Sequence, residues 1–232
     1  MIALIETVRS SARMRRFENR LVIFDCDGVL VDSEPIAARL TAEAVSELGW
    51  QMSPEVAKSE FLGDTFANII RRVEERIGHP VPAEWPAKSQ ANLLRALERE
   101  LTPVPGVRAA IEALTTAGAQ LAVGSQGTHE KMQLTLGVTG LLPFFAGRIF
   151  SATQVARPKP APDLFLLAAH TLGFLPSQTV VVEDSTRGVK AALAAGMRIL
   201  GYTASVGREA IVAAGAEPVD DLAQVPALLG LS

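Results

Sequence analysis

The chain has 232 residues and a net charge of −3, and 48% of its residues are hydrophobic. This composition is typical of a water-soluble globular protein with one large domain, or with one domain and an insert. No apolar run approaches the roughly 18 residues that a membrane-spanning helix needs, and apart from the N-terminal segment no basic stripe is present to neutralise nucleic-acid phosphates. We therefore expect neither a membrane nor a nucleic acid as a partner.

The first 19 residues are basic, and we interpret residues 1–19 as an N-terminal extension. Glu6 and the pair Ser10 and Ser11 interrupt the apolar core that a secretion signal would need. Cys26 is the single cysteine of the chain, which excludes an intramolecular disulfide and favours a reducing compartment. A cytoplasmic location is therefore expected.

The first predicted strand, 21–25, ends in acidic residues. Its apolar run stops at Asp25, Asp27 follows two residues later, and Gly28 permits a tight turn. In open parallel sheets ligands bind beyond the carboxyl ends of the strands, so both carboxylates would lie at a ligand-binding edge. An Asx turn, in which the two side chains only bond nearby amides, is an equally good explanation of this pair alone.

No strand pattern occurs between residues 36 and 101. Apolar residues recur there at helical spacing, in stretches that glycines and prolines separate. We expect residues 36–101 to form an inserted helical domain, while 20–35 and 102–232 form the core domain. The chain returns to the core through a linker that Pro103 and Pro105 stiffen.

After residue 102 the chain alternates between strand and helix patterns. Short apolar runs predict strands at 120–124, 147–151, 179–183 and 197–202. Segments of helical period that stop at a glycine predict helices at 106–117, 161–172, 186–195 and 207–214. This alternation predicts an α/β fold with a Rossmann-like parallel sheet, helices on both faces and an inserted helical domain.

Further polar groups follow the later strands. Ser125 and the amides after it precede a helix that begins near Thr128, where an anion could bind. Lys159 lies between two prolines, and Glu183 and Asp184 end another strand. Four converging carboxylates would repel one another, whereas a divalent cation and a lysine would balance them.

Four segments in this order resemble the four motifs of the haloacid dehalogenase superfamily: "FDCDGVLVDSEP", "GSQG", "RPKPAPD" and "VVEDSTRG". The resemblance covers residues 20–225, and the helical block resembles the cap domain of the phosphatase and β-phosphoglucomutase branch. It implies that Asp25 is the nucleophile and Asp27 the general acid and base. It also implies that phosphate is bound by Gly124, Ser125, Gln126 and Lys159. Mg²⁺ would be coordinated by Asp25, by the backbone carbonyl of Asp27 and by Asp184, with Glu183 in support.

The resemblance also suggests that a loop of the helical cap faces the substrate. The specificity candidates there are Leu62, Asp64, Thr65 and Asn68. Asp64 is equally plausible as the N-cap of a helix that begins near Thr65.

Three residues beside the motifs have competing interpretations. We expect Cys26 to be a small buried residue rather than a reactive thiol. His129 follows the Ser125 motif and is a weaker candidate for substrate contact. For Arg187, a substrate contact and a role on the helix surface are about equally plausible.

The leading functional prediction is Mg²⁺-dependent hydrolysis of a small phosphorylated metabolite, such as a sugar phosphate, through an aspartyl phosphate. The alternative enzyme is a sugar-phosphate mutase of the β-phosphoglucomutase type. Ala37 and Phe66 count against it, because they stand where that mutase has a histidine and an arginine. A non-catalytic phosphate-binding regulatory domain would need the loss of a motif residue. We expect a monomer or a weak homo-oligomer.

Overall fold

The computed structural model describes residues 19–61 and 64–231. The described residues divide into two compact units, one within Asp32–Thr102 and the other comprising the described residues on both sides of it. The predicted bounds of the inserted domain, 36–101, lie within the first of these units. No helix in the described residues is long and apolar enough to span a membrane.

The core unit contains a six-stranded sheet in which every paired neighbour is parallel, in the order β3-β2-β1-β4-β5-β6. The strands are β1 (Leu21–Phe24), β2 (Gln120–Ser125), β3 (Ile149–Ser151), β4 (Thr179–Glu183), β5 (Arg198–Tyr202) and β6 (Glu217–Val219). The chain runs outward from β1 to β3 and then returns to the other side of β1 at β4. The carboxyl ends of β1 and β4 therefore meet at the switch point, where ligands bind in such sheets.

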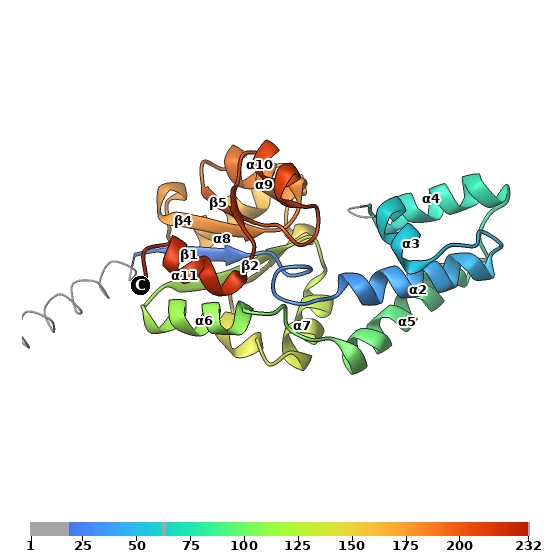
Figure 1. The fold of residues 1–232 in the computed structure, drawn as a ribbon, viewed down its shortest axis with the longest axis horizontal. Coiled ribbons are helices and arrows are strands. Elements are labelled where there is room, and N and C mark those ends of the chain that lie inside the picture. The colour runs from blue at the N-terminus through green and yellow to red at the C-terminus, as the bar shows by residue number, and fades with distance from the viewer. Residues whose placement is uncertain (1–18, 62–63, 232) are drawn as a thin grey trace, which may run out of the picture. The chain divides into compact units, whose positions relative to one another are not determined.

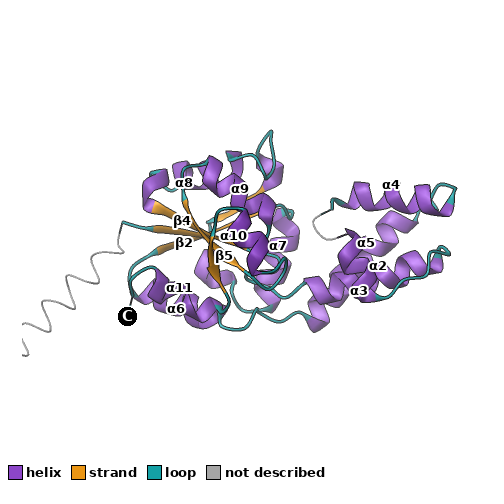
Figure 2. Ribbon diagram, turned by 45° about the horizontal axis from the view of Figure 1, so that its top comes forward, coloured by secondary structure: helices purple, strands orange, loops and turns teal. Residues whose placement is uncertain are grey.

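Helices cover both faces of this sheet, as predicted (Figure 1). Figure 2 shows α8 and α9 on one face and α6 and α11 on the other. The core helices are α6 (Val107–Thr116), α7 (His129–Val138), α8 (Asp163–Thr171), α9 (Thr186–Ala194), α10 (Arg208–Ala213) and α11 (Val225–Leu228). The α/β prediction is therefore confirmed.

The alternation of side chains along β1 explains why helices pack on both faces. Leu21 and Ile23 belong to the buried cluster formed with α8 and α9. Phe24, one residue on, contacts the ring of Phe145 edge-to-face at 6.2 Å between centroids. All four residues of β1 are fully buried, as expected for a strand covered on both sides.

The edge strand β6 was not predicted from the sequence. Its three residues include Pro218, which reads as a strand breaker because proline cannot donate a ladder hydrogen bond. β6 pairs only with β5 in the sheet order, so it lies at an edge where proline is tolerated.

The second unit contains four helices in its described residues: α2 (Glu34–Glu47), α3 (Pro54–Phe61), α4 (Phe66–Ile77) and α5 (Trp85–Glu100). Helix α3 has few apolar residues and was not predicted. The buried residues that hold this unit together include Val45, Phe61 and Val73. Trp85 anchors α5 to α2 because its indole nitrogen donates to the carbonyl of Ala44 at 3.2 Å.

Candidate active site

The backbone after β1 places Asp25 at the carboxyl edge of the sheet. The Asp25 amide donates to the carbonyl of Val182 on β4 at 2.9 Å, which continues the pairing beyond the last residue of β1. Gly28 then takes a φ of 76°, a conformation that glycine adopts without a steric penalty. A Cβ at Gly28 would lie 2.0 Å from Oδ2 of Asp184, so glycine also allows this loop to approach β4 closely.

A buried lysine links the first and last motifs. The Nζ of Lys159 donates to Oδ1 of Asp25 and to Oε1 of Glu183, each at 2.7 Å. Lys159 is 2% exposed, and its Nζ lies 4.8 Å from the centroid of the Phe165 ring. Burial by itself lowers the pKa of Lys159, but the charges of Asp25 and Glu183 outweigh it and raise this pKa, so the ammonium stays charged.

The side chain of Glu183 also organises the start of α9. Its Oε2 accepts from the backbone amide of Ser185 at 2.7 Å and from the Ser185 hydroxyl at 2.8 Å. The Ser185 hydroxyl in turn caps α9 by accepting from the amide of Gly188 at 3.0 Å. A Cβ at Gly188 would lie 1.9 Å from Glu183, so only glycine leaves room for the carboxylate.

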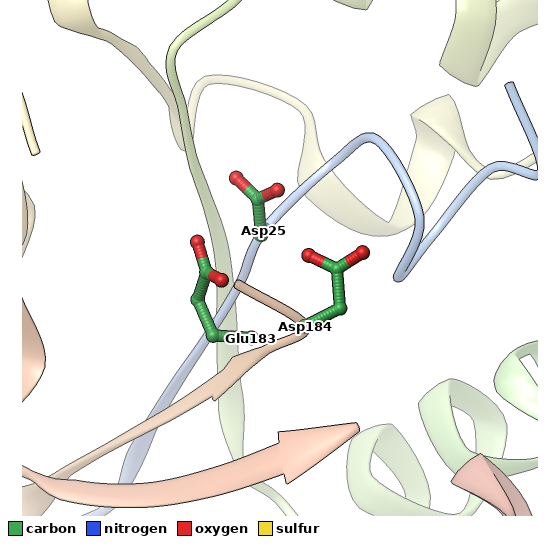
Figure 3. A group of neighbouring side chains, drawn as sticks. All are labelled: Asp25, Glu183 and Asp184. Carbon is green, nitrogen blue, oxygen red and sulfur yellow. The ribbon is translucent and has the colours of Figure 1, made fainter. Parts of the chain in front are cut away.

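Three carboxylates meet at this edge, namely Asp25, Glu183 and Asp184 (Figure 3). All three are buried, and each offers an oxygen within 4.8 Å of the others. Burying this much like charge is unfavourable without a cation, and oxygen ligands of this kind suit Mg²⁺. The donor set therefore fits the metal ion predicted from the sequence.

The pKa of Asp25 is raised to about 7, because burial and the charge of Glu183 together outweigh the opposing attraction of Lys159. The ionised form of Asp25 is thus unfavourable in this arrangement of side chains. A cation at the cluster would favour the ionised form, which is the nucleophilic one.

Asp27 lies beside a residue that the sequence did not single out. The Nζ of Lys131, on α7, donates to both carboxylate oxygens of Asp27 at 2.8 Å each. The carboxylate of Asp27 is not part of the three-carboxylate cluster, and it pairs with Lys131 instead of Lys159. Lys131 was missed because a lysine on the first turns of a helix is usually a solvated surface residue.

A second missed residue is Ser205, in the loop after β5. Its hydroxyl donates to Oδ2 of Asp184. A serine in a loop has no sequence signal that distinguishes it from a turn residue. The contact becomes visible only when β5 is placed beside β4.

Comparison with known proteins identifies the family to which this chain belongs. The family model described as "Haloacid dehalogenase-like hydrolase" matches residues 22–202. The chain belongs to this family. It is accordingly an enzyme, a hydrolase of the haloacid dehalogenase superfamily, as the motifs indicated.

Individual relatives cover nearly the whole of this haloacid dehalogenase-like hydrolase. The 6-phosphogluconate phosphatase of Escherichia coli (strain K12) is 31% identical over 208 residues, which are 89% of this chain and 93% of the relative. A haloacid dehalogenase-like protein of unknown function from Agrobacterium tumefaciens has a TM-score of 0.80 at 37% identity and covers 90% of this chain and 96% of its own. A hydrolase of the same family from Deinococcus radiodurans, solved with bound phosphate and sodium, has a TM-score of 0.77 at 31% identity and covers 92% and 96%.

The predicted phosphate-binding segment of the hydrolase follows β2. Ser125 is 1% exposed, and its hydroxyl accepts from the amide of Gly127 at 3.2 Å. The hydroxyl of Ser151 at the end of β3 holds the same loop by donating to the carbonyl of Gly127 at 2.7 Å. Gly124 is a packing residue, because a Cβ there would crowd Ile23 and Phe165, and Gln126 is exposed. Phosphate binding by this segment stays a prediction.

The structure shows the surroundings of Cys26 and Arg187, whose roles had competing interpretations. Cys26 is 1% exposed, and burial raises the pKa of its thiol, as expected for an inert packing residue. Arg187 donates from Nη2 to the carbonyl of Lys159 at 2.9 Å, so it supports the loop that carries this lysine. His129 is the first residue of α7 and is half-buried, and its contact with substrate stays a prediction.

The specificity candidates lie in the helical unit. Leu62 is outside the described residues. The hydroxyl of Thr65 caps α4 by accepting from the amide of Asn68 at 3.3 Å, so the interpretation of Asp64 as the cap is wrong. Asp64 instead forms an ion pair with Arg72 of α4, with 2.9 Å between Nη1 and Oδ2. Asn68 donates to the same carboxylate at 3.5 Å.

Proposed function

We propose that this hydrolase is a Mg²⁺-dependent phosphatase, and that it acts on a small phosphorylated metabolite through an aspartyl phosphate on Asp25. The observation that carries the proposal is the buried arrangement of Asp25, Lys159 and Glu183 beside Asp184. A carboxylate beside a charged lysine, at the ligand-binding edge of a parallel sheet, is the arrangement that attack on an anionic phosphoryl group requires.

The first half-reaction forms the phosphoenzyme. An oxygen of Asp25 attacks phosphorus, and the bond between phosphorus and the leaving oxygen breaks. Asp27 gives its proton to the leaving oxygen, so an alcohol departs. Lys159, Ser125 and the amides after Ser125 oppose the charge on the remaining phosphoryl oxygens.

The second half-reaction reverses the proton flow. Asp27, now ionised, takes a proton from a water molecule, whose oxygen attacks phosphorus. The bond between phosphorus and Asp25 breaks, and inorganic phosphate leaves. Asp25 returns as a carboxylate and Asp27 as a protonated acid, so both residues are ready for the next turnover.

The metal site proposed for this phosphatase comprises the carboxylates of Asp25 and Asp184 and the backbone carbonyl of Asp27. Glu183 supports it, since both of its oxygens bond Lys159 or Ser185. When bound, Mg²⁺ supplies positive charge that allows the carboxylates to coexist and polarises the phosphoryl oxygens.

The relatives guide the substrate class. One relative is named for hydrolysis of 6-phosphogluconate, so a phosphorylated sugar or sugar acid is the class that we propose. A mutase is less well supported, because Phe66 stacks on Trp85 with 6.0 Å between ring centroids and an interplanar angle of 4°. The aromatic ring thus has a packing role where the mutase has a polar group. A cytoplasmic location and a monomer or weak homo-oligomer complete the proposal.

The test is a phosphate-release screen with purified protein and Mg²⁺ against a panel of phosphorylated metabolites. The panel includes sugar phosphates, phosphorylated sugar acids, nucleotides and p-nitrophenyl phosphate. We expect release from at least one sugar monoester, loss of release in EDTA and recovery with Mg²⁺. Full activity in EDTA would contradict the metal assignment. Formation of glucose 6-phosphate from β-glucose 1-phosphate without release of phosphate would favour the mutase.

A further inference from the structure

The pairing of Lys131 with Asp27 is not required by any of the four motifs. Asp27 comes from the loop after β1 and Lys131 from α7, and the two residues are 104 positions apart in the chain. The ammonium nevertheless bonds both carboxylate oxygens at 2.8 Å. Two equal hydrogen bonds fix the orientation of a carboxylate as well as its position.

The start of α7 is built to bring Lys131 to this place. The Thr128 hydroxyl caps the helix by accepting from the amide of Lys131 at 3.3 Å, which fixes the backbone from which the side chain extends. A Cβ at Gly127 would lie 3.7 Å from Cδ of Lys131, so the lysine stem runs beside this glycine. The side chain of Lys131 is 27% exposed and that of Asp27 is 31% exposed.

The charge of Lys131 is stable in this setting. Burial by itself lowers the pKa of Lys131, but the charge of Asp27 and the hydrogen bonds to it outweigh burial and raise this pKa. Asp25 adds to the rise, so the ammonium lies within electrostatic range of both aspartates of the first motif.

We propose that Lys131 is a positioning residue, which holds the carboxylate of Asp27 in the orientation from which it exchanges protons with the leaving group and with water. The inference rests on the proposed function, because Asp27 needs a defined position only if it transfers protons. Without Lys131, the Asp27 carboxylate would turn away from the like charge of Asp25. A displacement of about 1 Å at a reacting group is enough to slow a step about 100-fold.

The two half-reactions separate this role from a general loss of structure. An aryl leaving group such as p-nitrophenolate departs without a proton, so the first half-reaction on p-nitrophenyl phosphate does not need Asp27. On this substrate Asp27 passes its proton to solvent, and its carboxylate then takes a proton from the water that attacks the aspartyl phosphate, so the second half-reaction still needs Asp27. Loss of Lys131 should therefore slow the second half-reaction on this substrate and spare the first.

The experiment compares wild type with Lys131→Met by stopped-flow on p-nitrophenyl phosphate with Mg²⁺. We expect a p-nitrophenol burst within about threefold of the wild-type rate, and a steady-state kcat about 10- to 100-fold lower with KM nearly unchanged. Lys131→Arg should restore much of kcat, because a guanidinium donates two parallel hydrogen bonds to a carboxylate. Lys190→Met, on the exposed surface of α9, is the matched control and should behave as wild type.

A crystal structure of each variant provides a readout that does not depend on turnover. The Asp27 carboxylate should leave its position in Lys131→Met and keep it in Lys131→Arg; Lys131→Gln replaces the methionine variant if that variant fails to fold. An unmoved Asp27, or equal losses in the burst and in kcat, would overturn the inference. Absence of phosphate release by wild type would instead count against the proposed function, and the crystal structures would still decide the position of Asp27.

Discussion

The two units of this hydrolase use their charged residues in different ways. In the core unit, charges that are far apart in sequence meet in buried contacts, such as Lys159 with Asp25 over 134 positions. In the helical unit, the ion pairs are exposed or half-buried, as with Arg71 and Glu75 or Arg72 and Asp64. Exposed pairs of this kind contribute little to stability, because water and salt screen the two charges. Burying charged groups at the reactive site thus lowers the stability of the core unit, whereas the charges of the helical unit support solubility and its helices.

This difference predicts that substitutions in the two units affect different properties and by different amounts. A change at the sheet edge should alter chemistry strongly, and some changes there should even stabilise the fold. A change on the surface of the helical unit should alter selectivity or stability by small amounts.

Asp25→Asn should lower phosphate release more than about 1,000-fold, because an amide is a poor nucleophile toward phosphorus. The same variant should be more stable than wild type in EDTA at pH 8, by about 1–3 kcal/mol, because it removes a buried carboxylate whose ionisation is unfavourable. Denaturant unfolding monitored by circular dichroism measures this difference. Glu209→Gln on the exposed surface of α10 is the control and should change neither quantity.

The pH dependence of this effect has a definite sign. The pKa of Asp25 is raised to about 7, so without metal the folded protein holds this proton more tightly than the unfolded chain does. The contribution of Asp25 to stability is therefore full below about pH 4 and is lost as the pH rises through about 7. Asp25→Asn should remove this loss, and a pH profile of stability that is unchanged by the substitution would contradict the assignment.

Gly188→Ala should also be severe, against the usual trend for a glycine in a helix. Alanine normally stabilises a helix by about 0.5–1 kcal/mol relative to glycine, but here its Cβ would meet Glu183 at 1.9 Å. We expect a loss of about 1–3 kcal/mol in unfolding free energy and at least a tenfold loss in kcat, because Glu183 positions Lys159.

The matched control for Gly188→Ala is Gly137→Ala, within α7. Apart from its chain neighbours and the nearby backbone of α7, no described atom lies within 4 Å of the Cβ that it would add. This variant should be stabilised by about 0.5–1 kcal/mol with unchanged activity. Equal stabilisation in both variants would show that the contact between Gly188 and Glu183 is easily relieved.

Ser205→Ala should weaken Mg²⁺ binding about tenfold, because its hydroxyl orients a carboxylate proposed to hold the ion. Titration calorimetry of the protein with Mg²⁺ measures this directly, and kcat at saturating Mg²⁺ should change much less. Ser177→Ala in an exposed connection is the control. An unchanged affinity for Mg²⁺ would mean that Ser205 serves only the loop after β5.

Asn68→Ala tests the helical unit and should have the smallest effect. We expect the ratio of kcat/KM between sugar phosphates and p-nitrophenyl phosphate to fall about three- to tenfold, because an aryl phosphate needs few specific contacts. Arg71→Ala, on the same helix, should leave this ratio unchanged and cost at most about 0.5 kcal/mol of stability through its pair with Glu75. Equal losses on both substrates would indicate that Asn68 only supports the fold of α4.

The features of this protein that follow from chain direction could be predicted from the order of the amino acids. Alternating strand and helix patterns require parallel strands, and the carboxyl ends of parallel strands lie at one edge. Asp25 and Asp184 each follow a strand directly, so their convergence could be predicted from strand ends alone. The predicted ends of the strands β1, β2, β4 and β5 lie within one residue of the observed ends.

The pairing of side chains across that edge depends on how distant elements pack together. Lys131 and Ser205 lie on a helix and a loop with no local pattern that marks them, and their partners are Asp27 and Asp184 on other elements. Such contacts depend on where α7 and the loop after β5 pack against the sheet, which no local propensity encodes. Hydrogen bonds act over about 3 Å, so only the packed positions of these elements select the partners.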